Sequence, residues 1–420
     1  MECTVAEYRR QAPVTGDALG GLIVGVTSPA PREAWLAVLA ADPNALVSQT
    51  PDWLDCICAS GTYEDASRLY ETGNGRRLVL PLVRRRGLPG PLAIEASLPW
   101  GWGIGGLLAP GGPQAEEIAA VVRDLARRRV LRISLRTNPV QAALWAGLQG
   151  RGIVAVPRLS HTLDLEGGFA TVWSQRFTHS ARGAVRKAER AGLRVERDTS
   201  GRLLPVYHTL YERSLSRWAE QQHEPPWLAR WRGERRDSPA KLQAILRTLG
   251  ERAQLWVAWL GERAAAAIVV LQGANASYAR GVMDKELAGP TRANYLLQRL
   301  AIEDACRAGC RYYHMGESGA SQSLAQYKTR FGAVAQPNTE YKVERLPLTA
   351  MDRALRGLVK RIIGFRDVWQ PVGAQRPRPA TGFDAAHEPD MGPSWGSEPD
   401  GSNAWPGYRH DAEGDESHLR

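Results

Sequence analysis

The chain has 420 residues, 43% of them hydrophobic, and a formal net charge of +10. This length and composition predict a globular chain of two domains. The five cysteines form neither a disulfide framework nor a zinc-binding spacing, and the eight histidines form no metal-binding pair, so we expect no metal and a reducing cytoplasm. Because no apolar run reaches about 18 residues and the N-terminus lacks an apolar core, we expect neither a membrane span nor a secretory leader.

Positive charge is concentrated away from the C-terminus. Residues 374–420 carry four arginines and nine acidic residues, so the rest of the chain has a net charge of +15. A body of that charge favours an anionic partner such as tRNA, a nucleotide diphosphate, coenzyme A or an acidic membrane surface. A coding bias toward arginine, with the charges scattered and solvated, explains the excess equally well.

Strand and helix patterns alternate through the first part of the chain, after a flexible start at residues 1–20. Helices are predicted at Pro31–Leu39, from Thr50 with Pro51 at the first helical position, and at Ala115–Arg128. Strands are predicted at Arg77–Val83 and Val130–Leu135. We assign residues 21–158 to one folded unit.

A glycine-rich segment near the middle of that unit matches a dinucleotide-binding pattern in its glycine spacing but not in its structural context. Gly101–Gly106 has the spacing G-x-G-x-x-G, but no helix opens on its last glycine. An aromatic loop that lines a substrate channel through Trp100 and Trp102 fits better. A plain connector between strands is the alternative.

A second unit is predicted from residue 159 to residue 346. It starts with a strand at His161–Leu165 and continues with helices at Phe177–Ala191, Pro205–Ser216 and Lys241–Leu249. Arg217–Asp237 mixes tryptophans, prolines and charges, which indicates a loop or an irregular flap. Residues 347–373 hold a basic amphipathic helix, Met351–Val368, and residues 374–420 form a tail of low hydrophobicity that we expect to be disordered.

The helix Phe177–Ala191 carries two distinct faces. Its apolar face consists of Ala181, Ala184, Val185 and Ala188. Its basic row consists of Arg182, Arg186 and Arg190, with Lys187 beside them. Guanidinium groups in a row can bind a phosphate or pyrophosphate, although a solvated surface face is an equally good interpretation.

Three apolar runs separated by short turns precede a helix and a further strand between residues 255 and 332. The runs are Leu255–Leu260, Ala264–Leu271 and Ser277–Met283; a helix starts at Arg292, and Tyr312–Met315 is a buried strand. This pattern predicts an antiparallel meander that feeds one helix and one more strand.

Two positions in the meander point to substrate binding. Tyr278 and Arg280, two residues apart on one strand, are expected on the same face, where Arg280 can clamp a substrate carboxylate. A structural ion pair with Asp284, Glu303 or Glu317 is at least as good an account of Arg280.

The segment after the last core strand contains a lysine between aromatic residues. Lys328 follows Tyr327 and precedes Phe331, at the expected mouth of a groove, where its charge can stabilise an oxyanion or hold a phosphate. The alternative is that Tyr327 and Phe331 pack as a helix pair, and that Lys328 extends along them to solvent.

These features together resemble a known family. The helix at Ala181–Leu193, the meander, the segment around Ala288–Pro290 and the sequence Leu324–Gly332 are similar, in the same order, to FemABX-like and CelD-like acetyltransferase domains of the GNAT superfamily. The resemblance covers about 160–345 best and implies an α/β (α+β) fold. It implies tandem GNAT-like units with a central, mostly antiparallel mixed sheet flanked by helices.

The resemblance also implies roles for individual residues. Lys328 is expected near the reacting carbonyl, with Tyr327 and Arg330 in the same motif, and Arg182, Arg186 and Lys187 are expected to contact phosphate. This chain departs from the family at Tyr327, where many relatives carry phenylalanine. It also lacks the glycine-rich pyrophosphate loop in Ala288–Ala293, which weakens a coenzyme A interpretation.

We therefore expect a cytoplasmic acyltransferase that joins an activated acyl or aminoacyl group to an amine, with no tightly bound cofactor. Aminoacyl-tRNA is the favoured donor and acyl-CoA the alternative, and a noncatalytic module that binds anionic precursors is a third hypothesis. The acceptor is an amine-bearing small molecule or a nucleotide-linked precursor of the cell wall, a polysaccharide or a secondary metabolite. Asp284 and Glu317 are candidate general bases. The helix at 351–368 contacts an anionic membrane or packs on the core.

Overall fold

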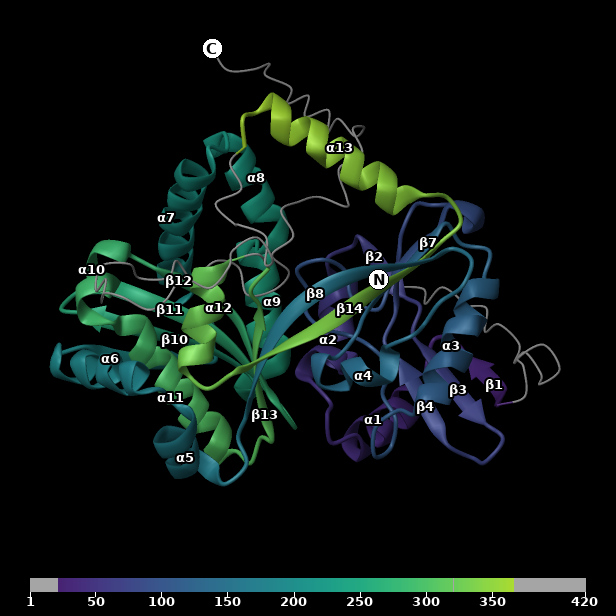
Figure 1. Ribbon diagram of the computed structural model, residues 1–420, viewed down its shortest axis with the longest axis horizontal. Helices are drawn as coiled ribbons and strands as arrows, with labels where there is room; N and C mark the ends of the chain where they lie inside the picture. Colours follow the sequence, from purple (N-terminus) through teal and green to yellow (C-terminus); the bar gives the residue numbers. More distant parts are fainter. Residues whose placement is uncertain (1–21, 320, 366–420) are drawn as a thin grey trace, which may run out of the picture.

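The computed structural model describes residues 22–319 and 321–365 (Figure 1). The strands form two sheets. The smaller sheet has the order β1-β3-β4, with β1 Ile23–Thr27, β3 Arg68–Thr72 and β4 Arg77–Leu80. The larger sheet has 11 strands in the order β2-β5-β6-β7-β14-β8-β13-β12-β11-β10-β9. Its strands are β2 Tyr63–Asp65, β5 Val83–Arg85, β6 Ile94–Ala96, β7 Arg132–Arg136, β8 Ile153–Asp164, β9 Arg194–Asp198, β10 Ala253–Leu260, β11 Arg263–Gln272, β12 Ala276–Met283, β13 Tyr312–Glu317 and β14 Val334–Glu344.

Two long strands, β8 and β14, cross the middle of the larger sheet and join the two halves of the molecule (Figure 1). They pair antiparallel without interruption from Val334↔Thr162 to Val343↔Ile153. Residues 158 and 159, where the sequence analysis divides the two units, are neighbours inside β8. Only β6–β7 and β12–β13 pair in parallel among the described strands, so the expected mostly antiparallel mixed sheet is confirmed.

The helices of the N-terminal half follow the sequence prediction closely. They are α1 Arg32–Ala41, α2 Pro51–Ala59, α3 Ala115–Arg127 and the short α4 Ala142–Trp145. The Thr50 side chain accepts a hydrogen bond from the Trp53 N–H, which confirms the predicted cap of α2. The inward face predicted for α3 is confirmed, because Ile118, Val121 and Leu125 are fully buried.

Helices cover both faces of the sheet in the C-terminal half. The longer ones are α6 His179–Arg190, α7 Leu204–Gln222, α8 Pro226–Arg236, α9 Pro239–Leu249, α11 Ala293–Arg307 and α13 Leu348–Ile362. The shorter ones are α5 Gly168–Thr171, α10 Lys285–Thr291 and α12 Gln322–Arg330. Residues of α7 and α9 share one apolar cluster with β10 and β11, and residues of α6 and α11 share the cluster on the opposite face.

The loop or flap predicted for Arg217–Asp237 is wrong. Helix α7 continues to Gln222, because Trp218 is buried against the core, and α8 occupies most of the remainder. Pro226 takes the first position of α8, where its fixed φ favours a helix and its missing N–H costs nothing. The prolines that indicated a break therefore mark a helix start.

The meander predicted from three apolar runs is confirmed. Strands β10 and β11 pair antiparallel up to Leu260↔Arg263, and β11 pairs antiparallel with β12. Helix α10 was not foreseen; Asp284 caps it by accepting from the Glu286 N–H. The predictions for residues 1–20 and 374–420 lie outside the described residues. The basic helix predicted at Met351–Val368 is α13, but it begins earlier, at Leu348, and ends at Ile362. Between residues 22 and 365, residue 320 apart, no helix combines the length and the apolar character that a membrane crossing requires.

The turn between α12 and β14 depends on a glycine. Gly332 has φ +83°, and a Cβ there would lie 2.5 Å from the carbonyl oxygen of Arg176. Gly309, after α11, also has a positive φ of +77° but has nothing within 4 Å of an added Cβ. Alanine at Gly309 would therefore meet backbone strain alone, whereas alanine at Gly332 would meet both backbone strain and a steric clash.

We expect Gly332→Ala to lower the free energy of unfolding by about 2–4 kcal/mol, because the left-handed conformation and the clash add. Gly309→Ala, which meets only the conformational cost, should lose about 1–2 kcal/mol. Denaturant unfolding of both variants measures the difference, and equal losses would contradict the steric account.

Candidate active site

The sheet opens between β12 and β13. These parallel strands pair only at Ala276↔Tyr313 and Ser277↔His314, at the start of both strands. Beyond these pairs β12 continues to Met283 and β13 to Glu317 without pairing to each other. The C-terminal ends of these two parallel strands are thus not joined by a ladder between them, as expected for the predicted groove.

Tyr278 and Arg280 lie on opposite faces of the sheet, so the prediction that they share a face is wrong. A bulge in β12 is the reason, since Val270 pairs with Tyr278 but Val269 pairs with Arg280, and Ala279 is skipped. Tyr278 packs in the cluster with α11, whereas the Arg280 guanidinium lies 2.8 Å from Asp237 at the end of α8. None of the three ion-pair partners considered for Arg280 in the sequence is the observed one.

Lys328 is fully buried at the end of β13. Its Nζ donates to the carbonyl oxygens of Gly316 at 3.0 Å and Glu317 at 2.6 Å. Burial lowers the pKa of Lys328 to about 7, although the Glu317 charge works in the opposite direction. The side chain therefore does not extend to solvent; it fixes two main-chain carbonyls of the strand that borders the groove.

Two histidines lie in the same buried region. Burial, assisted by the Lys328 charge, lowers the pKa of His161 to about 4, and burial alone lowers the pKa of His314 to about 4. His314 Nδ1 is 3.3 Å from the Thr162 hydroxyl. Both imidazoles are thus neutral at physiological pH.

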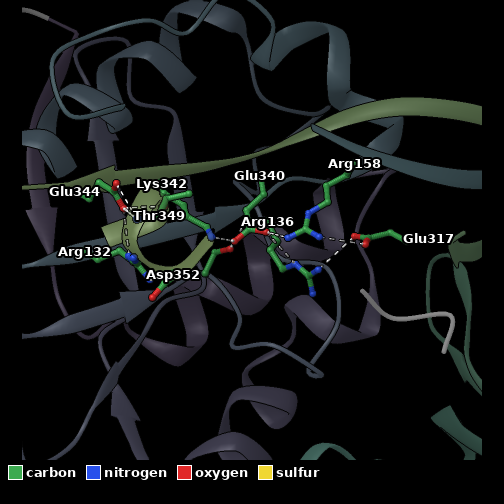
Figure 2. Close-up of polar contacts among 10 residues, drawn as sticks. Arg132, Arg136, Arg158, Glu317, Glu340, Lys342, Glu344, Thr349 and Asp352 are labelled. Carbon is green, nitrogen blue, oxygen red and sulfur yellow. Dashed lines mark hydrogen bonds and ion pairs between the residues drawn. The ribbon is translucent and has the colours of Figure 1, made fainter. Parts of the chain in front are cut away.

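Glu317 connects the Lys328 region to a charged face of the sheet. Its carboxylate lies 3.3 Å from Arg136 and 3.9 Å from Arg158, and both arginines also reach Glu340 (Figure 2). Burial acts to raise the pKa of Glu340, but Arg158, Arg136 and Lys342 together lower it to about 2. Arg136, Arg158 and Lys342 also line a cavity of about 60 Å³.

Asp284 is occupied by structural contacts. It caps α10 and forms ion pairs with Arg213 at 2.6 Å and Arg263 at 3.4 Å. These contacts occupy both oxygens of the carboxylate. Its role as a general base stays a prediction that these contacts do not favour.

The three residues of α6 that are predicted to contact phosphate divide into one anchored and two accessible side chains. Arg182 is half-buried and donates to the carbonyl oxygens of Trp173 and Ser174, which lie in the preceding π-helical turn Val172–Arg176. Arg186 and Lys187 are exposed. Their predicted contact with phosphate stays a prediction, and Arg182 is less free to make it.

Tyr327 and Arg330 belong to an aromatic cluster of the core. Tyr327 is fully buried, its ring meets those of Tyr295 and Phe331 edge-on, and its hydroxyl donates to the Asn294 carbonyl. Arg330 donates to the Tyr295 hydroxyl at 3.0 Å. The helix pair of Tyr327 and Phe331 is therefore present.

Trp100 and Trp102 lie against a polar cluster that the sequence analysis missed. Lys241 Nζ is 4.3 Å from the centre of the Trp102 ring, and Arg236 lies over Trp100 at 5.8 Å. Arg236 and Asp237 were hidden in the segment interpreted as a loop. The sequence Ser238-Pro239 was the available signal, since Ser238 accepts from the Lys241 N–H as the cap of α9.

The structure thus groups the predicted residues in three places. Lys328 and Glu317 meet at the end of β13; Arg280 approaches the tryptophan loop through Asp237; and Arg186 and Lys187 lie on the outer side of α6. Within the described residues, no group of three or more His, Cys, Asp or Glu side chains could hold a metal ion.

Three comparisons with known proteins bear on this arrangement. Residues 175–329 match the family model described as "Acetyltransferase (GNAT) domain". No curated protein matches the sequence. The chain is similar to three solved structures, whose identities and scores do not carry substrates over to this chain.

The first is FemX, with 12% identity, a TM-score of 0.49, and coverage of 79% of this chain and 98% of that one. The second is "L-PGS from Bacillus licheniformis", with 15% identity, a TM-score of 0.41, and coverage of 80% of this chain and 98% of that one. The third is the C-terminal domain (DUF2156) of a putative lysylphosphatidylglycerol synthetase from Agrobacterium fabrum. Its identity is 12% and its TM-score 0.41, and the match covers 81% of this chain and 98% of that one. The family match spans α6, the meander, the opening between β12 and β13, and α12. This protein therefore carries a GNAT acyltransferase domain, as the sequence resemblance implied.

Proposed function

We propose that the protein transfers an aminoacyl group from aminoacyl-tRNA to an amine, in the cytoplasm. The acceptor would be a cell-wall precursor or a secondary metabolite. The observation that carries the reaction class is the opening between β12 and β13 within the matched GNAT domain. An ester placed there lies between the separated ends of β12 and β13, and binding both reactants in one groove supplies proximity.

The segment before α11 supports tRNA over coenzyme A. A pyrophosphate loop would run through residues 288–293, but here α10 leads into α11 through Arg292 alone, which has φ 58°. The Arg292 N–H is used by the Ala288 carbonyl. A helix in place of a glycine-rich loop offers fewer free N–H groups to a pyrophosphate. Acyl-CoA remains the second candidate because the matched domain is of the acetyltransferase kind.

Lys328 would act on this reaction from behind the groove. Its two hydrogen bonds fix the end of β13, and its partial positive charge at neutral pH lies below the carbonyl groups that it holds. Glu317, kept between Arg136 and Lys328, would orient the incoming amine.

A donor assay tests the proposal. The protein is incubated with an amine acceptor and either radiolabelled aminoacyl-tRNA or radiolabelled acetyl-CoA. We expect the aminoacyl-tRNA to be consumed, and Lys328→Ala to reduce turnover about 100-fold. Lys285→Ala, at an exposed lysine of α10, is the matched control and should retain full activity.

Consumption of acetyl-CoA alone would establish the second candidate. Consumption of neither donor, with retained binding of a nucleotide sugar, would favour the noncatalytic module. Unchanged turnover in a folded Lys328→Ala variant would show that Lys328 has no part in catalysis.

The buried position of Lys328 also predicts an unusual pH dependence of stability. Its pKa is about 7 in the folded chain and 10.5 in its ordinary state, so between these values the unfolded chain binds one more proton. The free energy of unfolding should then rise with pH by about 1.4 kcal/mol per pH unit from this group. Lys328→Met should lose that contribution, and denaturant unfolding of both proteins at about pH 6 and about pH 9 measures it. A constant difference between the two proteins would contradict the lowered pKa.

Helix α13 supports a proposed peripheral contact with an anionic membrane. Met351, Leu355, Leu358 and Ile362 form one stripe along it and are 55–74% exposed. The opposite side contacts the body, where Asp352 lies 2.9 Å from Arg132. The apolar stripe thus faces outward on a helix that also carries the exposed cations Arg353 and Arg361, a combination that suits a surface of anionic lipid.

We expect the protein to sediment with vesicles of phosphatidylcholine and phosphatidylglycerol, and less with phosphatidylcholine alone. Leu355→Glu combined with Leu358→Glu should abolish sedimentation, because charge on the stripe opposes insertion. Leu92→Glu, at an exposed leucine elsewhere, is the control. Equal sedimentation of all three proteins would exclude α13 as the contact.

A further inference from the structure

A buried polar cluster lies where α7, α8, α9 and β12 meet the loop around Trp102. Asp237 is at its centre. The Asp237 carboxylate contacts Arg280 at 2.8 Å, Arg236 at 3.3 Å and Lys241 at 3.5 Å. Lys241 also donates to the carbonyl oxygens of Gly101 at 2.7 Å and Arg236 at 2.6 Å.

The cluster has more positive charge than its own groups can balance. Three cations surround Asp237. Among the described residues, the ion pairs of these three cations all go to this one carboxylate. Their side chains are 4–10% exposed, so water screens them little. Burial lowers the pKa of Lys241 to about 8, which still leaves it mostly protonated at neutral pH. A surplus of two positive charges in such surroundings is unfavourable unless an anion joins them.

Several buried donors in the cluster also lack partners. Arg280 is 3% exposed, and its Nε and Nη1 atoms make no hydrogen bond to any described residue. The buried Tyr207 hydroxyl and the Trp100 Nε1 are likewise without a hydrogen-bond partner in the described part of the chain. Burial raises the pKa of Tyr207 well above its usual value, so the hydroxyl remains a donor and does not balance the charge. Each unsatisfied donor carries a desolvation penalty that an oxygen ligand would remove.

The cluster is placed beside the proposed reaction groove. Arg280 follows the bulge of β12, beyond the last pair between β12 and β13. The N-terminal half supplies the opposite wall, since the Gly101 carbonyl accepts from Lys241 and a Cβ on Gly101 would lie 3.2 Å from Arg236. A ligand held there contacts both halves of the chain and remains close to the splayed strands.

We propose that Arg236, Lys241 and Arg280 bind a phosphoryl group of the small-molecule acceptor, an inference that rests on the proposed acyl transfer. A phosphoryl group carries up to two negative charges and three acceptor oxygens, which matches the surplus charge and the free donors. A single carboxylate supplies half of that charge. The three cations are only 4–10% exposed, which does not suit a tRNA backbone, because such a backbone needs an open surface.

Calorimetric titration of the whole chain with inorganic phosphate, without donor, tests the site. We expect saturable binding, with acetate at least tenfold weaker. Arg280→Lys keeps the charge and the reach to Asp237 but removes the guanidinium donors, and should weaken phosphate binding about tenfold or more. Arg307→Lys, at an exposed arginine of α11, is the matched control and should bind as the unaltered chain does.

Trp100→Phe removes one uncharged donor and should weaken phosphate binding about tenfold, so the test does not depend on one variant. Absence of saturable phosphate binding to the unaltered chain would overturn the proposal. So would acetate bound as tightly as phosphate, or unchanged affinity in folded Arg280→Lys and Trp100→Phe. Phosphate binding that persists while no donor is consumed would support the site and count against the acyl transfer.

Discussion

The pairing of β8 with β14 is the interaction on which the rest of the structure depends. These strands pair without interruption from residue 153 to residue 162, and each also pairs with a strand of one half, β13 with β8 and β7 with β14. A continuous ladder of main-chain hydrogen bonds leaves little freedom for one half to move against the other. Residues from distant parts of the sequence can therefore hold fixed distances at the groove.

The ion pairs around Glu317 follow from that ladder. Arg136 comes from β7, Arg158 from β8 and Glu340 from β14, and their side chains meet on one face because neighbouring positions across a sheet share a face (Figure 2). Glu317 thereby links this charged face to Lys328, whose Nζ it holds through its own carbonyl. The end of β13, which borders the groove, is fixed from both sides.

The two charged regions of the groove differ in their balance. At Glu317 and Glu340 the carboxylates nearly match the neighbouring cations, and their contacts account for the arrangement as it stands. Around Asp237 the cations outnumber the carboxylate three to one, and Arg280 keeps two donors unused. Charge balance in a medium of low dielectric is thus the property that distinguishes the two regions.

The sequence determined most of the local structure. Apolar spacing placed α3, α6, the meander and β13 within a few residues, because burial of one face imposes a period of 3.6 or 2 on the chain. The motif around Lys328 likewise pointed to the GNAT acyltransferase domain that residues 175–329 match.

Only the tertiary structure decided which groups meet. The bulge in β12 separated Tyr278 from Arg280, and it depends on pairing with β11, which the spacing of β12 does not contain. Asp237 became the partner of Arg280 because α8 folds onto α7, although the two residues are 43 positions apart in the sequence. Burial of Lys328 is also a property of the assembled core. Local sequence fixes periodicity, whereas charge pairing and desolvation depend on contacts between distant segments, which chain folding alone brings together.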